Sequence, residues 1–215
     1  MAGKTVPVPS DRSATTRPAF VAAVDRFLVT LEAIGPDQWS VAASDEWSVR
    51  QLAAHVVRGM AVIAEYLDSE LPVPDTVLAD AAAYFRAALS MDGVHEGIAG
   101  RAVTAAEGAG DDVPAWAREV AGSAVARVAD TDDDEVVVHF AGALRFVDYL
   151  DTRTTELVLH TLELQVACGL DPGAPAVALD VVNGVLLALV DRADPVALAL
   201  ALTGRPGPVA CNVLG

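Results

Sequence analysis

The sequence predicts a mainly helical protein, folded as a bundle of amphipathic helices. Apolar residues recur three and four positions apart along most of the chain, which is the pattern of helices that bury one face. Capping residues, glycines and prolines divide this pattern into segments of helical length. The short segment 136–140 is instead rich in β-branched residues, so we expect it to be extended.

The first two helices have the clearest signals. The first is expected over 15–34, where a single apolar stripe repeats. The second is expected to begin at Ser48, whose side chain can cap the free amides of the first turn while Gln51 reaches back to it. Trp47, just ahead, can pack on Leu52 as a hydrophobic staple.

The rest of the chain is expected to complete the bundle. Gly169 is the expected C-terminal cap of the last long helix, and the region after it is expected to pack back on the helices before it. We therefore divide the chain into a helical bundle over 14–170 and a small C-terminal region over 171–215. The remaining helical segments are expected at 79–90, 94–107, 114–129, 144–168, 177–190 and 195–202.

Composition and charge exclude several classes of partner. The longest apolar stretch, 177–190, is broken by Asp180 and Asn183, so no membrane span is expected. The net charge of −16 repels nucleic-acid backbones and anionic lipids. No secretory signal is visible, and Cys168 and Cys211 have no metal-like or redox spacing. We expect a soluble cytoplasmic protein with both thiols reduced.

Three residues form the candidate site. Glu156 and His160 are four positions apart in one helical segment, so their side chains share a face. His55 lies on the core-facing side of the helix that begins at Ser48. If the two helices are neighbours, two imidazoles and one carboxylate converge. This is a ligand set for a divalent metal with one coordination position open.

Other interpretations of the same residues stay open. Glu156 and His160 also suit an ordinary ion pair, and a single histidine on an apolar face is more often a satisfied core residue. Arg153, one turn before Glu156, suits either a surface ion pair or a group that orients the carboxylate or receives an anionic substrate. His95 and His139 have no partner spacing and are expected to be surface or loop histidines.

Two motifs resemble a known family. The segments 47–55 and 149–160, and the spacing between them, are similar to the mycothiol-dependent maleylpyruvate isomerase family of actinobacteria, within the DinB-like metalloenzyme superfamily. The likeness extends over nearly the whole chain, including 202–205. Family members usually have Asp three residues after the second histidine, whereas this chain has Glu163.

The resemblance implies a fold, a metal and a reaction. The fold is a DinB-like four-helix bundle with a small C-terminal α or α/β appendage. The metal is a divalent ion, usually zinc, and by motif its ligands are His55, Glu156 and His160. The cofactor is mycothiol or a similar low-molecular-weight thiol, which becomes the nucleophile once its proton is lost to metal coordination.

The expected function is therefore an isomerase or S-transferase acting on a small electrophile, with Arg153 as its candidate catalytic residue. Two alternatives remain: a non-catalytic bundle that binds a small molecule or a partner protein, and a metal-dependent hydrolase that uses water. The expected partners are the thiol and the small-molecule substrate, with no nucleic acid and no membrane. The expected state is a monomer or homodimer.

Overall fold

The computed structural model describes residues 13–45, 47–91, 94–110, 112–190 and 196. Within these residues the protein is mainly helical, as predicted, with one small two-stranded sheet. The elements are α1 (Ser13–Ala33), the 3-10 turn η1 (Pro36–Gln38), α2 (Val49–Leu67), α3 (Ala81–Leu89), α4 (Val94–Gly108), α5 (Val113–Asp130), β1 (Val136–His139), β2 (Gly142–Arg145), α6 (Phe146–Ala167) and α7 (Ala176–Val190).

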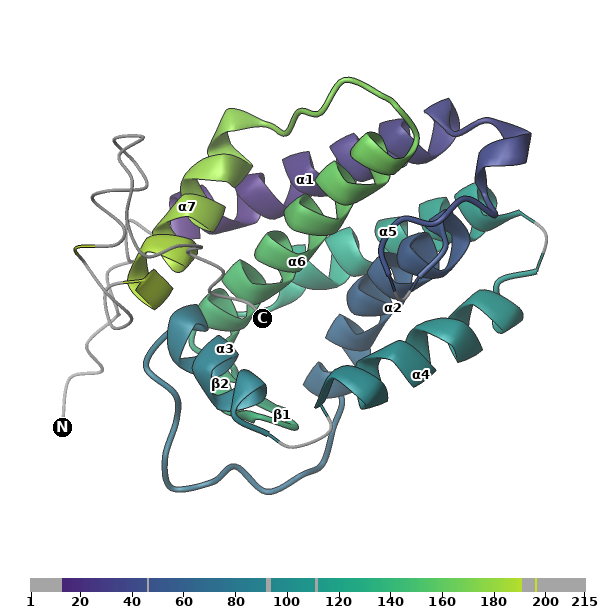
Figure 1. Cartoon of the computed structure of the whole chain (residues 1–215). Coiled ribbons are helices and arrows are strands. Elements are labelled where there is room, and N and C mark those ends of the chain that lie inside the picture. The colour runs from purple at the N-terminus through teal and green to yellow at the C-terminus, as the bar shows by residue number, and fades with distance from the viewer. Residues whose placement is uncertain (1–12, 46, 92–93, 111, 191–195, 197–215) are drawn as a thin grey trace, which may run out of the picture.

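Four of the helices form a bundle. α1 packs against α6, α6 against α2, α2 against α5, and α5 back against α1. Figure 1 shows α6 running through the middle of the molecule between α1 and α2, with α4 outside α2 and α7 on the side of α1. The predicted four-helix bundle is therefore confirmed, and α6 is the helix that contacts most of the other elements.

The predicted helix ends are confirmed where their signals are strongest. Ser48 caps α2: its Oγ accepts from the Gln51 amide, and the Gln51 side chain accepts from the Ser48 amide. α6 ends at Ala167 with Cys168 as its cap residue, and Gly169, the next residue, has a positive φ of 65°. The Gly169 and Leu170 amides donate to the Val166 and Gln165 carbonyls, which satisfies carbonyls that the helix end leaves free.

The central position of α6 explains its buried polar residues. Thr152, Thr154 and Thr155 are completely buried. Each hydroxyl donates to a carbonyl one turn earlier in the same helix, so burial leaves none of them unpaired. Larger apolar side chains fill the space around them, including Tyr149 and, on α1, Phe20. α6 is therefore held from several sides, which fixes the side chains that it presents to α2.

The predicted start of the last long helix, at residue 144, is wrong because a hairpin precedes α6. The expected extended segment is β1, but residues 142–145, whose second half we assigned to the helix, form the second strand, so α6 begins at Phe146. The strands are antiparallel, with Val137 opposite Leu144. Gly142 takes a φ of 136°, a conformation that suits glycine. Pairing with β1 satisfies the backbone of 142–145 and competes with an earlier helix start.

α7 packs on α1, α3 and α6, in agreement with the expected return of the C-terminal region onto the bundle. The division at residues 170 and 171 stays a prediction. The helix predicted at 195–202 and the motif at 202–205 lie outside the described residues, apart from residue 196. No helix in the described ranges combines the length and the apolar character that crossing a bilayer requires.

Candidate metal centre

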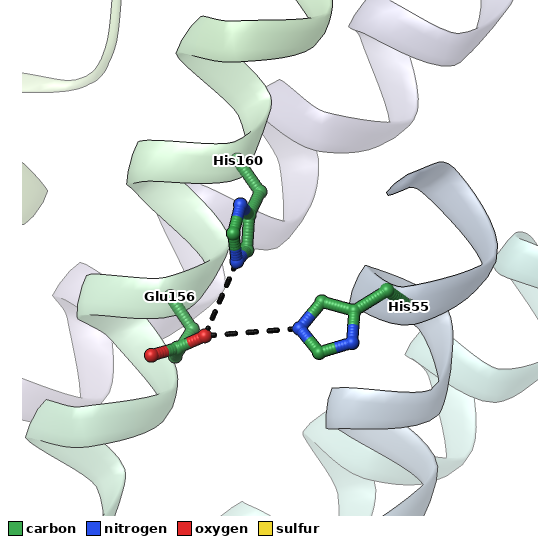
Figure 2. A group of neighbouring side chains, drawn as sticks. All are labelled: His55, Glu156 and His160. Atoms are coloured by element: carbon green, nitrogen blue, oxygen red, sulfur yellow. Dashed lines mark hydrogen bonds and ion pairs between the residues drawn. The ribbon is translucent and has the colours of Figure 1, made fainter. Parts of the chain in front are cut away.

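The three predicted site residues meet between α2 and α6. The Oε2 atom of Glu156 lies 3.2 Å from His160 Nε2 and 3.8 Å from His55 Nε2. One ligand atom from each residue lies within 4.8 Å of the others. Figure 2 shows both imidazoles turned toward the same carboxylate oxygen. The structure thus brings together all three residues that the sequence proposed as ligands.

Local structure accounts for this convergence. The capping box at Ser48 sets where α2 begins, and His55 follows two turns later on the side that meets α6. On α6, the four-residue spacing stacks Glu156 and His160 on one face. Each side chain is partly exposed, between 18% and 33%. The cluster therefore lies at the edge of the core, where a small ligand can reach it.

Glu163 completes the arrangement around His160. The His160 Nδ1 atom lies 2.8 Å from Glu163 Oε2, so this carboxylate accepts a hydrogen bond from the imidazole. The bond fixes the ring so that Nε2 faces Glu156. Histidines that bind metals usually donate from their second nitrogen in this way, to a carboxylate or a carbonyl. Glu163, which replaces the Asp usual in the resembling family, makes this contact.

The three groups influence one another's ionisation. Burial alone would raise the pKa of the Glu156 carboxyl, but the hydrogen bond with His160 and the nearby His55 imidazole hold that pKa well below its usual value. Burial alone would lower the pKa of His160, but its bonds to Glu156 and Glu163 raise it to about 9. For His55, burial dominates and lowers the pKa. At neutral pH the cluster holds a carboxylate, a neutral imidazole and an imidazolium.

Arg153 lies beside the cluster. Its guanidinium carbon is 5.2 Å from the centre of the Tyr149 ring, and its Nε donates to Thr152 Oγ1 at 3.1 Å. No carboxylate among the described residues forms an ion pair with it, so the surface ion pair considered above is not formed. Positive charge without a paired carboxylate suits recognition of an anionic group.

A small pocket opens at the cluster. Arg153 and the three candidate ligands line it together with apolar residues of α1, α2 and α6. There is free space beside Gly59, since a Cβ at this position would meet no atom within 4 Å. The lining residues are Phe20, His55, Val56, Gly59, Met60, Arg153, Glu156, Leu157 and His160.

The prediction for His139 is wrong. This residue ends β1 and is buried, with only 7% of its surface exposed. Its Nδ1 lies 3.0 Å from the Tyr84 hydroxyl, and its ring centre is 4.3 Å from that of Tyr66. Pairing across the hairpin turns the side chain inward, and the partners come from distant segments, so local spacing carries no signal for it. The side chain of His95 lies outside the described residues.

These features define a class: a four-helix bundle with a His, Glu and His cluster between two facing helices, beside a pocket that contains an arginine. Residues 20–165 match the model of the family described as mycothiol maleylpyruvate isomerase N-terminal domain. This match covers more than half of the chain, which therefore belongs to that family, as its motifs predicted. Comparison with the curated proteins and with the solved structures found no match.

Proposed function

We propose that this protein is a metal- and mycothiol-dependent enzyme, an isomerase or an S-transferase that acts on a small electrophile. The observation that carries the proposal is the convergence of His55, Glu156 and His160 beside a pocket lined by Arg153. Membership of the mycothiol maleylpyruvate isomerase family supports the thiol and the reaction class.

The donor set fits a divalent metal, and zinc in particular. Two imidazoles and one carboxylate are the protein ligands of many catalytic zinc sites, which keep one position open for water or substrate. His55, Glu156 and His160 would hold the ion. A zinc ion at this position would supply Lewis acidity, which deprotonates a coordinated thiol and makes it a nucleophile at neutral pH.

The chain's own residues perform the remaining tasks. Glu156 supplies negative charge that partly offsets a dication, and Glu163 keeps the His160 ring in its binding orientation. Arg153 receives an anionic group of the substrate and holds the electrophilic carbon near the thiol. The apolar lining from Val56, Met60 and Leu157 limits access of water.

Metal content is the first test. Protein purified without added metal is expected to contain about one zinc per chain, and H55A, E156Q and H160A are each expected to lose most of it. Glu119→Gln changes an exposed carboxylate on α5 and serves as the matched control. A wild-type protein that binds no zinc, cobalt or manganese would remove the basis of the proposal.

Turnover with a thiol and a panel of conjugated electrophiles is the second test. We expect product only when metal and thiol are both present. R153M is expected to raise KM for an acid substrate much more than for its neutral ester, since only the acid uses the guanidinium. Tight binding without product would favour the non-catalytic alternative, and metal-dependent product without thiol would favour a hydrolase.

A further inference from the structure

Trp47, the residue before the Ser48 cap, contacts both imidazoles of the candidate metal centre. Its ring centre lies 4.8 Å from that of His55, with the planes inclined by 31°, and 6.0 Å from that of His160, at 65°. The two imidazoles are 5.1 Å apart and nearly perpendicular, at 86°. The three rings therefore form one packed group in which Trp47 lies over His55 and meets His160 by an edge contact.

The backbone around Trp47 is tied into a closed turn. Its carbonyl accepts from the amides of Ala43, at 2.8 Å, and Ser44, at 3.1 Å, and its own amide donates to Ser44 Oγ at 3.1 Å. The next residue is the Ser48 cap, so the turn and the helix start are one continuous hydrogen-bonded unit. These bonds fix the position from which the indole reaches the imidazoles.

The two imidazoles differ in how they are held. His160 donates from Nδ1 to Glu163, which sets its ring orientation. Among the described residues, His55 has no such hydrogen bond at Nδ1: its contacts are Glu156 at Nε2 and the neighbouring rings. A ligating histidine whose second nitrogen is unanchored must have its ring fixed by packing. The indole is the nearest ring to His55.

Hydrophobic packing alone does not account for a tryptophan at position 47. Its Nε1–H is buried and has no hydrogen-bond partner among the described residues, which costs about 1–3 kcal/mol. A phenylalanine in the same place would avoid that cost. Trp47 is not one of the residues that line the pocket, so it contacts the imidazoles without filling the opening.

We infer that Trp47 is a positioning residue for the metal centre: it holds the His55 ring with Nε2 toward Glu156, in place of a hydrogen bond at Nδ1, which no residue in the described ranges provides. The inference rests on the metal centre proposed above. It predicts that removing the ring weakens metal binding without removing any ligand, because His55 then samples orientations that point Nε2 away from the site.

Zinc affinity of variants tests this directly, measured by competition with a chromogenic chelator. W47L is expected to bind zinc about 10-fold to 100-fold more weakly than wild type, the range seen when groups that orient ligands are lost. W47F keeps an aromatic ring against His55 and is expected to stay within about 3-fold. W116F, which alters a tryptophan on α5, is the control and should match wild type.

Fluorescence gives a readout that a general loss of stability would not mimic. The chain has three tryptophans, so the W39F/W116F variant leaves Trp47 alone. Saturation with Co²⁺ is expected to quench most of this emission, whereas W47F, which retains Trp39 and Trp116, should be quenched far less. If W47L does not fold, W47M takes its place under the same criterion.

The outcomes separate the inference from the proposal that it rests on. A wild-type protein that binds neither Zn²⁺ nor Co²⁺ defeats the metal centre itself. A wild-type protein that binds zinc while W47L or W47M binds it equally well overturns the role of Trp47 and leaves the centre intact. Trp47 emission that Co²⁺ leaves unchanged, in protein loaded with Co²⁺, likewise overturns the inference.

Discussion

Glu163 and His160 form a hydrogen bond of 2.8 Å on the same face of α6 as Glu156, which lies one turn before His160. The carboxylate accepts from Nδ1, and the Nε2 atom of the same ring faces Glu156 at 3.2 Å. His160 is therefore held between two carboxylates that have different roles. One orients the ring, and the other shares the space in which a cation would bind.

Variants at position 163 should tune zinc affinity without removing a ligand. E163A is expected to weaken zinc binding about 10-fold or more, because the His160 ring loses its anchor. E163Q keeps an acceptor oxygen without its charge and should fall between E163A and wild type. E163D, the residue usual in the resembling family, tests whether the shorter chain still reaches Nδ1. Calorimetric titration with zinc measures all three, and equal affinities would contradict the assigned role.

Zinc binding should release a proton. In the metal-free protein, hydrogen bonds to Glu156 and Glu163 outweigh burial and raise the pKa of His160 to about 9, so the ring is protonated at pH 7. The lowered pKa of His55 leaves that ring neutral. Because zinc needs a neutral imidazole, about one proton should leave per ion at pH 7, and affinity should fall as pH decreases below 9.

Calorimetry in two buffers with different ionisation enthalpies counts this proton. E163A provides the comparison: without one of the two bonds that raise the pKa of His160, the released fraction at pH 7 should decrease. Release of no proton from the wild-type protein at pH 7 would show that His160 is already neutral in the absence of metal.

The features that the sequence predicted well are those with local causes. The start of α2 follows from the side chains of Ser48 and Gln51, and the end of α6 follows from a glycine that accepts a positive φ. The pairing of Glu156 with His160 follows from helix geometry alone. The meeting of these two with His55 needed only one further condition, which is that α2 and α6 are neighbours, and the bundle satisfies it.

The features that were missed depend on contacts between distant segments. β2 has apolar residues compatible with a helix, and only its pairing with β1 makes it a strand. His139 is buried by Tyr66 and Tyr84, far away in the sequence. Trp47 was expected to pack on Leu52, which stays a prediction, but its contact with His55 depends on the turn that precedes α2. Contacts of this kind leave no periodic pattern in the sequence.

The Tyr84 and His139 pair should contribute to stability as a unit. The Tyr84 hydroxyl lies 3.0 Å from His139 Nδ1 in a buried cluster, so removing either partner deprives the other of this hydrogen bond. H139L and Y84F are each expected to cost about 1–3 kcal/mol in the free energy of unfolding, and the double variant less than their sum. Urea denaturation of all four proteins measures this coupling, and additive costs would mean that the bond contributes nothing.

Among the glycines that the structure describes, Gly142 in the hairpin should be the least tolerant of a methyl group. Gly142 has a φ of 136°, and a Cβ there would lie 2.9 Å from Leu78 Cδ1. Relief of this contact requires the Leu78 side chain to turn away, while its backbone amide stays hydrogen-bonded to the Ala143 carbonyl at 2.7 Å. G142A therefore combines backbone strain with a clash, and we expect it to lower the free energy of unfolding by about 1–3 kcal/mol.

Gly122 provides the opposite case for the same substitution. It lies in the interior of α5, is exposed, and a Cβ there would meet no atom within 4 Å. G122A should therefore raise stability by about 0.5–1 kcal/mol, the ordinary preference of a helix for alanine over glycine. Urea denaturation of the two variants should give changes of opposite sign. If G142A is as stable as wild type, the hairpin adopts another turn in solution, and the burial of His139 that depends on its register is then in question.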